Sequence, residues 1–91
     1  MQLETFVAKS EEMGDFYVYF TDPVLKVEKF AVATTDLSTP YIAKSTRRKP
    51  KLEAGEVLMW NWTSNNFFKL PIFCIKKLVP LSSVLKNDGT N

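Results

Sequence analysis

Five cations within eight positions form the most chemically distinctive segment of this sequence. They are Lys44, Arg47, Arg48, Lys49 and Lys51. No acidic residue occurs between Asp36 and Glu53 to neutralise them, and Pro50 disfavours helical geometry in front of it. Such a cluster repels itself unless it is solvated or faces an anion. The pattern predicts an exposed basic loop, and three alternatives stay open: a surface for phosphate groups, a site for an acidic protein, or a solvated loop without a ligand.

Aromatic side chains are the second distinctive feature of the sequence. They make up 13% of its 91 residues, more than one inward face of a small domain can bury. The strict alternation over residues 16–21 predicts a half-buried strand with Phe16, Val18 and Phe20 inward. Tyr17 and Tyr19 then face outward. Two further phenylalanines, Phe30 and Phe73, are expected in the core as bulky filling.

The two tryptophans follow the basic cluster closely. Trp60 and Trp62 share one face of a predicted strand, opposite Val57 and Met59. Nucleic-acid bases stack on exposed aromatic rings, and neighbouring cations contact the phosphates whatever the base sequence. The outward rings therefore form a candidate binding surface of Tyr17, Tyr19, Tyr41, Trp60 and Trp62. The alternative, that the tryptophans form the core while Val57 and Met59 face a neighbour, stays open.

Residues for catalysis are scarce. The chain has no histidine and a single cysteine, Cys74, which is expected as a buried mid-strand hydrophobe. Glu11 and Glu12 are adjacent and point apart in an extended chain, so they make a poor acid and base pair. There is no glycine-rich phosphate loop. We therefore expect no catalytic residue, no metal site, no cofactor and no enzymatic activity.

Charge is distributed unevenly along the chain. Residues 1–43 carry three lysines and seven acids, a net charge of −4, whereas residues 44–91 carry nine cations and three acids, a net charge of +6. The start of the sequence lacks a secretory pattern, and the apolar runs are far shorter than the roughly 20 residues that span a membrane. These features predict a cytoplasmic protein without a membrane segment.

Strand patterns dominate the predicted secondary structure. Strands are expected over residues 3–9, 16–21, 24–35, 57–62, 67–70 and 72–79, with a short strand starting at 41–43. The phase of the 24–35 segment slips near Glu28 and Lys29, as in a bulged or bent strand, and Pro71 is expected at an edge or a bulge. No window has a sustained helical period. The expected fold is all-β, a small five- or six-stranded barrel of OB-like or SH3-like type. Residues 1–85 form its single domain, with one capped helical turn at 82–85, and 86–91 form a flexible tail.

Residues 55–80 carry a family resemblance. Gly55 opens a strand, a polar turn follows at 64–66, and a basic and apolar strand ends in Leu78-Val79-Pro80. This segment resembles the closing strands of the filamentous-phage single-stranded-DNA-binding proteins, which are small dimeric OB-fold proteins. The resemblance implies an OB-like fold, a nucleic-acid ligand and a homodimer. The DNA-contacting hairpin of that family has no counterpart here, so no binding residue is transferred.

The sequence thus predicts a non-enzymatic module that binds nucleic acid, preferably single-stranded DNA or RNA, with a basic loop beside surface aromatics. The rival hypothesis is a small protein-interaction module, such as a phage-encoded inhibitor or adaptor, because protein interfaces are also enriched in Trp, Tyr and Arg. Composition does not separate the two.

Overall fold

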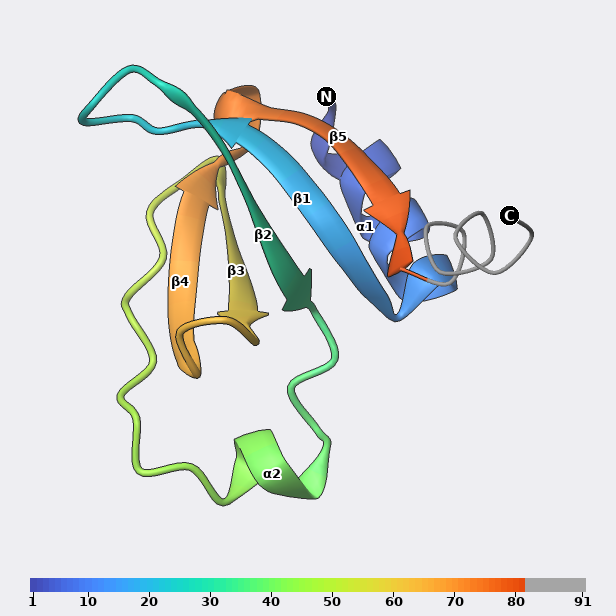
Figure 1. Cartoon of the computed structure of the whole chain (residues 1–91), viewed down its shortest axis with the longest axis vertical. Coiled ribbons are helices and arrows are strands. Elements are labelled where there is room, and N and C mark those ends of the chain that lie inside the picture. Colours follow the sequence, from blue (N-terminus) through green and yellow to red (C-terminus); the bar gives the residue numbers. More distant parts are fainter. Residues whose placement is uncertain (82–91) are drawn as a thin grey trace, which may run out of the picture.

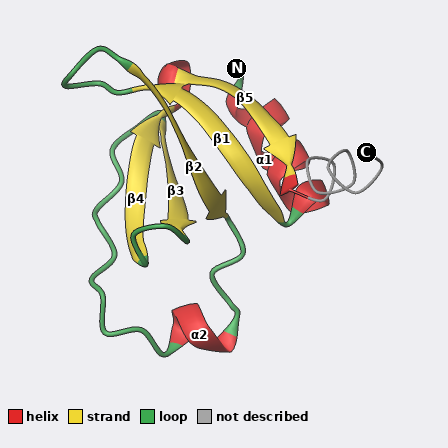
Figure 2. Cartoon of the chain, in the orientation of Figure 1, coloured by secondary structure: helices red, strands yellow, loops and turns green. Residues whose placement is uncertain are grey.

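The computed structural model describes residues 1–81. Figure 1 and Figure 2 show a strongly bent sheet with one helix packed behind it and a second, short helix at the far end of a long loop. In chain order the elements are α1 (Leu3–Met13), β1 (Asp15–Thr21), β2 (Glu28–Thr34), α2 (Pro40–Ala43), β3 (Glu56–Asn61), β4 (Asn66–Pro71), the 3-10 turn η1 (Ile72–Cys74) and β5 (Ile75–Pro80).

The five strands form one antiparallel sheet in the order β4-β3-β2-β1-β5. The prediction of a mainly β fold is confirmed. Pairing in the described chain leaves β4 and β5 as edges, so the sheet is not closed into a barrel by hydrogen bonds between them. Pro71 ends the edge strand β4, as expected of a residue that cannot donate to a ladder.

The main core lies on one face of this sheet, called the inner face below. Phe16, Val18 and Phe20 are buried there, whereas Tyr17 and Tyr19 on the opposite, outer face are only partly buried. The alternation predicted for residues 16–21 is therefore confirmed. Neighbouring strands complete this core with Ala31, Ala33, Val57, Met59, Leu70, Ile75 and Leu78.

The expectation of a strand at residues 3–9 is wrong, because this segment forms α1. Its buried stripe is narrow: only Phe6 and Ser10, one helical turn apart, are buried, so the apolar period is too weak to show in the sequence. Phe6 reaches the main core and meets Phe16 edge to face. Gly14 ends the helix with φ 74°, a left-handed conformation that favours glycine.

A second correction concerns residues 41–43, which form α2 and not the start of a strand. Thr39-Pro40 places a proline at the first helical turn, where its fixed φ is favourable and its missing N–H is not needed. Ile42 points from this one-turn helix onto the outer face of the sheet. There it builds a second apolar cluster with Trp60 and Phe67.

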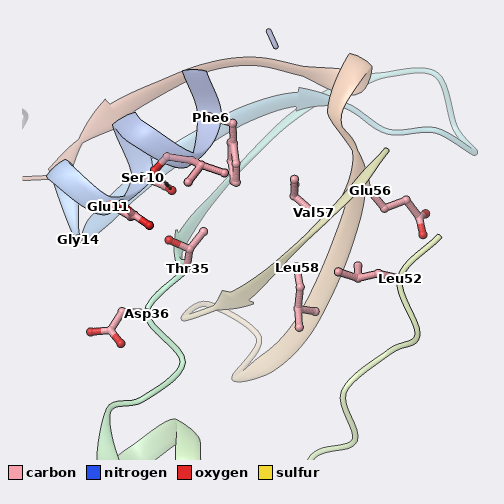
Figure 3. Close-up of a pocket in the computed structure, with 11 residues that line it drawn as sticks. Phe6, Ser10, Glu11, Gly14, Thr35, Asp36, Leu52, Glu56, Val57 and Leu58 are labelled. Atoms are coloured by element: carbon pink, nitrogen blue, oxygen red, sulfur yellow. Dashed lines mark hydrogen bonds between the residues drawn. The ribbon is translucent and has the colours of Figure 1, made fainter. Parts of the chain in front are cut away.

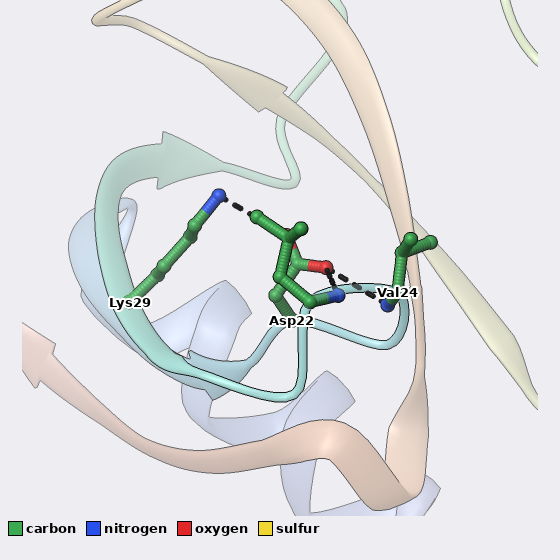
Figure 4. A network of polar contacts seen from close by, with 4 residues as sticks. Asp22, Val24 and Lys29 are labelled. Atoms are coloured by element: carbon green, nitrogen blue, oxygen red, sulfur yellow. Dashed lines mark hydrogen bonds and ion pairs between the residues drawn. The ribbon is translucent and has the colours of Figure 1, made fainter.

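The third expected strand is shorter than predicted. Residues 22–27 form the β1–β2 loop, and β2 begins only at Glu28, so the phase slip marks the end of a turn and not a bulge. Asp22 organises this loop: its Oδ1 accepts the backbone N–H groups of Val24 and Leu25 at 2.8 Å, and its Oδ2 lies 3.1 Å from Lys29 Nζ (Figure 4). A carboxylate in this position replaces ladder hydrogen bonds by local ones.

Two predicted core residues are on the surface. Phe30 is 62% exposed because it lies on the outer face of β2, and Phe73 is 79% exposed because the segment expected to begin the last strand forms η1 instead. Cys74 is buried as predicted, within this turn and not in mid-strand. The helical turn expected at 82–85 and the tail at 86–91 lie outside the described residues.

Candidate nucleic-acid interface

The outer face of β3 carries the aromatic cluster that the sequence places next to the basic loop. Trp60 pairs across the ladder with Phe67 of β4, and their rings meet edge to face at 4.9 Å between centroids. Ile42 of α2 covers them. Trp60 is consequently 1% exposed, so its prediction as part of the exposed surface is wrong. The tryptophans do lie opposite Val57 and Met59, but α2 buries the first of them.

Trp62 and Tyr41 form the accessible part of this cluster. Their ring centroids lie 5.9 Å apart with the ring planes tilted by 33°, and Tyr41 is 60% exposed whereas Trp62 is half-buried. The backbone N–H of Trp62 donates to the carbonyl of Val32 at 2.8 Å, and its indole Nε1 donates to Oδ1 of Asp15 at 2.9 Å. Two hydrogen bonds thus hold the Trp62 ring over β2 and the start of β1.

The basic segment is an exposed irregular loop, as predicted. It leaves α2 at Lys44, whose N–H donates to the carbonyl of Pro40. In Figure 1 the loop then runs beside the edge strand β4 towards the start of β3. Lys69 of β4 fixes its far end by donating to the carbonyl of Lys51 at 2.8 Å. Within residues 1–81 none of the five loop cations forms an ion pair, so their charge is available to a ligand.

The start of this loop and the aromatic cluster share a pocket of about 430 Å³. Lys44 and Arg47 supply two cations, and the buried Trp60 and the exposed Tyr41 supply rings. The remaining lining residues are Ser45, Thr46 and Asn65. Among residues 1–81 no acidic residue lines the pocket, and every polar side chain in the lining can donate a hydrogen bond.

The indole N–H of Trp60 is an unusual feature of this cluster. Its Nε1 atom is buried and has no hydrogen-bond partner in the part of the chain that is described. Buried donors are nearly always satisfied, because leaving one unpaired costs about 1 to 3 kcal/mol. The Nε1 of Trp62, only two residues later, is satisfied by Asp15.

Tyr17 and Tyr19 lie apart from the basic loop. They are on β1, separated from β4 by β2 and β3, a lateral distance of about 14 Å at the usual strand spacing. Phe30 packs against both rings, and Lys77 Nζ of β5 lies 4.9 Å from the centre of the Tyr19 ring. The outer face therefore carries a second aromatic group with a cation of its own.

The structure thus divides the ten predicted site residues. Tyr41, Lys44, Arg47 and Trp60 line the pocket, and Trp62 packs against the rings of Tyr41 and Trp60. Three further exposed cations follow in the loop, namely Arg48, Lys49 and Lys51, the last of which is bound through its carbonyl to Lys69 of β4. The two β1 tyrosines form the second group.

Sequence reasoning missed several of the neighbours in these groups. Ser45 and Thr46 lie between Lys44 and Arg47, and small polar residues in a loop do not by themselves indicate a binding site. Asn65 is the left-handed residue of the β3–β4 turn, with φ 53°. An asparagine in a turn sequence is explained by this conformation alone, so the sequence does not indicate that Asn65 also lines the pocket. Phe30 and Lys77 become visible only through strand register, since Tyr19 pairs with both of these residues across two ladders.

A larger pocket of about 650 Å³ has the opposite charge (Figure 3). Phe6 of α1 and Val57 of β3 contribute apolar surface, and Glu11, Asp36 and Glu56 contribute carboxylates. The N–H of Glu53 and the ammonium of Lys69 hold the pKa of Glu56 below its ordinary value, because both donate to the ionised form. With no basic residue in its lining, this pocket repels phosphate.

Neither a metal centre nor a membrane span is found in residues 1–81. No group of three or more His, Cys, Asp or Glu side chains there is placed to hold a metal ion, and no helix there has the length and apolar character to cross a bilayer.

Comparisons with family models, curated proteins and solved structures yield no match for this chain.

Proposed function

We propose that this protein is a non-enzymatic module that binds single-stranded nucleic acid. The observation that carries the proposal is the shared pocket, where Lys44 and Arg47 lie beside Tyr41 and Trp60 with no acidic residue in the lining. Cations attract the phosphates of any sequence, and an exposed ring offers a flat surface to a base. Both requirements are met at one place on the outer face.

Single strands suit this geometry better than duplexes do. Tyr41 is 60% exposed and Trp62 is half-buried, and a base can lie on such a ring only when it is unstacked from its neighbours. The loop cations lie between Arg47, which lines the pocket with Asn65 of the β3–β4 turn, and Lys51, whose carbonyl accepts from Lys69 of β4. None of them forms an ion pair within residues 1–81, so they can provide a track for the backbone. The second group, Tyr17, Tyr19 and Phe30, offers further rings on the same face.

For the fold type we propose the SH3-like alternative. Four consecutive strands pair with their sequence neighbours, and β5 returns beside β1 after the short turn η1. This connectivity supports an SH3-like sheet that is bent but open at β4 and β5. The resemblance of residues 55–80 to the phage single-stranded-DNA-binding proteins implies the other alternative, an OB-like fold, so it supports the proposed ligand and a homodimer but not this fold type.

A protein-interaction module is the second candidate, and a separate surface favours it. The β1–β2 loop and η1 lie at one end of the sheet, since Phe20 pairs with Ile75 there. This end exposes the apolar side chains of Val24, Leu25 and Phe73. Exposed apolar groups of this kind suit a protein partner and not a nucleic acid.

Titration of the protein with a single-stranded oligothymidylate of about 12 nucleotides tests the proposal. Affinity should fall steeply between about 50 and about 200 mM salt, because phosphate contacts release counterions. A duplex of the same length should bind more weakly at equal salt. Absence of oligonucleotide binding at low salt would exclude the nucleic-acid function and leave protein docking at the Val24, Leu25 and Phe73 surface as the better proposal.

A further inference from the structure

The pocket at the start of the basic loop is lined by hydrogen-bond donors from three different segments. Lys44, Thr46 and Arg47 come from the loop, Trp60 from β3 and Asn65 from the β3–β4 turn. The lining side chains thus offer an ammonium, a guanidinium, a hydroxyl, an amide and an indole N–H, and within residues 1–81 no lining residue carries a carboxylate to compete for them. A ligand with several acceptor oxygens and a negative charge satisfies this set best.

The unpaired indole N–H of Trp60 is a second, independent indication of a ligand. Trp60 is 1% exposed, it lines the pocket, and its Nε1 has no acceptor among residues 1–81. Thr39 Oγ1 is also buried without a partner, but Thr39 does not line the pocket. A buried donor without an acceptor is a feature that calls for a function or a bound group.

We infer that this pocket holds one phosphate group of the bound strand, with the Trp60 indole N–H as one of its donors. This inference rests on the proposed function and adds to it the pocket that is occupied and the chemical group, a phosphate, that occupies it. Arg47 is suited to a two-point contact with phosphate oxygens, and Lys44 adds a compact charge. The base attached to that phosphate would then lie near the exposed ring of Tyr41.

Access to the indole requires local movement. The Nε1 atom is covered, so a phosphate oxygen reaches it only when side chains above it shift. Tyr41, Lys44 and Arg47 are all exposed and belong to α2 or the irregular loop, so such a shift does not disturb the main core. Binding should therefore change the surroundings of Trp60 while the β1–β5 pairing stays intact.

The two indole N–H groups provide the experiment with an internal control. Nitrogen-15 labelled protein should give one indole signal from Trp60 and one from Trp62, and W60F assigns them. Titration with inorganic phosphate at constant ionic strength should shift the Trp60 signal downfield and saturably. The Trp62 signal should move much less, because its N–H is already donated to Asp15.

Single substitutions distinguish a specific phosphate site from the general attraction of phosphate to a positively charged loop. K44A and R47A should each weaken phosphate binding roughly tenfold or more, the usual effect of removing a hydrogen bond to a charged group. W60F, which keeps a ring and removes the donor, should also weaken it. The matched control is K9A, which removes one exposed charge from α1, outside both the pocket and the basic loop, and should leave phosphate affinity within about twofold.

The outcomes distinguish this inference from the proposed function. Equal or unsaturable shifts of both indole signals, or no shift of either, would overturn the phosphate pocket even when oligothymidylate binds. This result is obtained with the parent protein alone, so it does not depend on whether a variant folds. A Trp60 shift with phosphate but not with bound oligothymidylate would also overturn it, since the site would then serve a free anion. A Trp60 shift with both ligands, abolished by R47A and kept by K9A, supports it.

Discussion

Trp62 donates its indole N–H to Oδ1 of Asp15 across 2.9 Å, although 47 positions of the chain separate these two residues. This bond joins the end of β3 to the start of β1 and fixes the ring on the outer face of the sheet. Trp60, two residues earlier on the same face, is buried under α2 with its N–H unpaired within the described chain. Two tryptophans that look equivalent in the sequence thus have different environments.

The two tryptophans should therefore respond differently to alanine substitution. W62A should weaken single-stranded DNA binding by about 1 to 3 kcal/mol with little loss of stability, because a stacking ring is removed. W60A should instead cost about 3 to 5 kcal/mol of unfolding free energy, because a buried ring is removed from the Ile42 and Phe67 cluster. Fluorescence titration and thermal unfolding measure the two effects.

Two controls accompany that comparison. W62F keeps a flat ring and should retain part of the affinity, whereas D15A removes the hydrogen bond to Nε1 but keeps the ring and should bind at least as well as the parent. Equal oligonucleotide affinity of W62A and the parent would exclude stacking on Trp62.

Replacing Arg47, Arg48 and Lys49 together by alanine tests the basic loop. Unfolding should be nearly unchanged, because these exposed cations form no ion pair within the described chain. The slope of log affinity against log salt should decrease by up to about three, near 0.7 to 0.9 for each phosphate that the variant no longer neutralises. If the triple variant binds oligothymidylate like the parent at low salt, the loop is ordinary solvated surface.

The two faces of β1 should differ in their contribution to stability. F20A removes a side chain that packs in the main core against Phe68, and should cost about 3 to 5 kcal/mol in chemical denaturation. Y19A removes a partly buried ring that contacts Phe30 and Lys77 on the outer face, and should cost much less. Similar losses at both positions would contradict this assignment of faces.

Asp22 should make stability depend on pH in the acid range. The N–H groups of Leu25 and Val24, and then the Lys29 ammonium, lower its pKa below the ordinary 3.8 because all of them favour the carboxylate. Its contribution is present in full above pH 3.8 and is lost as the pH falls through the lowered pKa. D22A should melt at a lower temperature than the parent at pH 7, and this difference should shrink in strong acid.

The variant D22N separates the charge from the turn. Its amide oxygen still accepts the two N–H groups, so it should recover part of the stability that D22A loses, without the acid dependence. A difference between D22A and the parent that stays constant down to the lowest pH would show that the charge of Asp22 contributes nothing.

Strand positions were predictable where one face is buried. The alternation from Phe16 to Phe20 and the opposition of Met59 to Trp60 follow from a period of two residues, which the backbone imposes locally. The exposed basic loop was predictable for the same reason, because mutual repulsion of neighbouring cations needs no tertiary information. The helix α1 was not, since only Phe6 and Ser10 anchor it and its segment contains Thr5, Phe6 and Val7, which favour a strand.

The chain by itself therefore determined which residue types are available for phosphate and base contacts, and which side of most strands faces the core. Tertiary structure decided which of these residues meet. Tyr41 and Lys44 reach Trp60 only because α2 folds over the outer face, and Tyr17 and Tyr19 stay apart only because β2 and β3 lie between β1 and the loop. Strand order and helix docking depend on contacts between residues distant in sequence, so no local pattern encodes them.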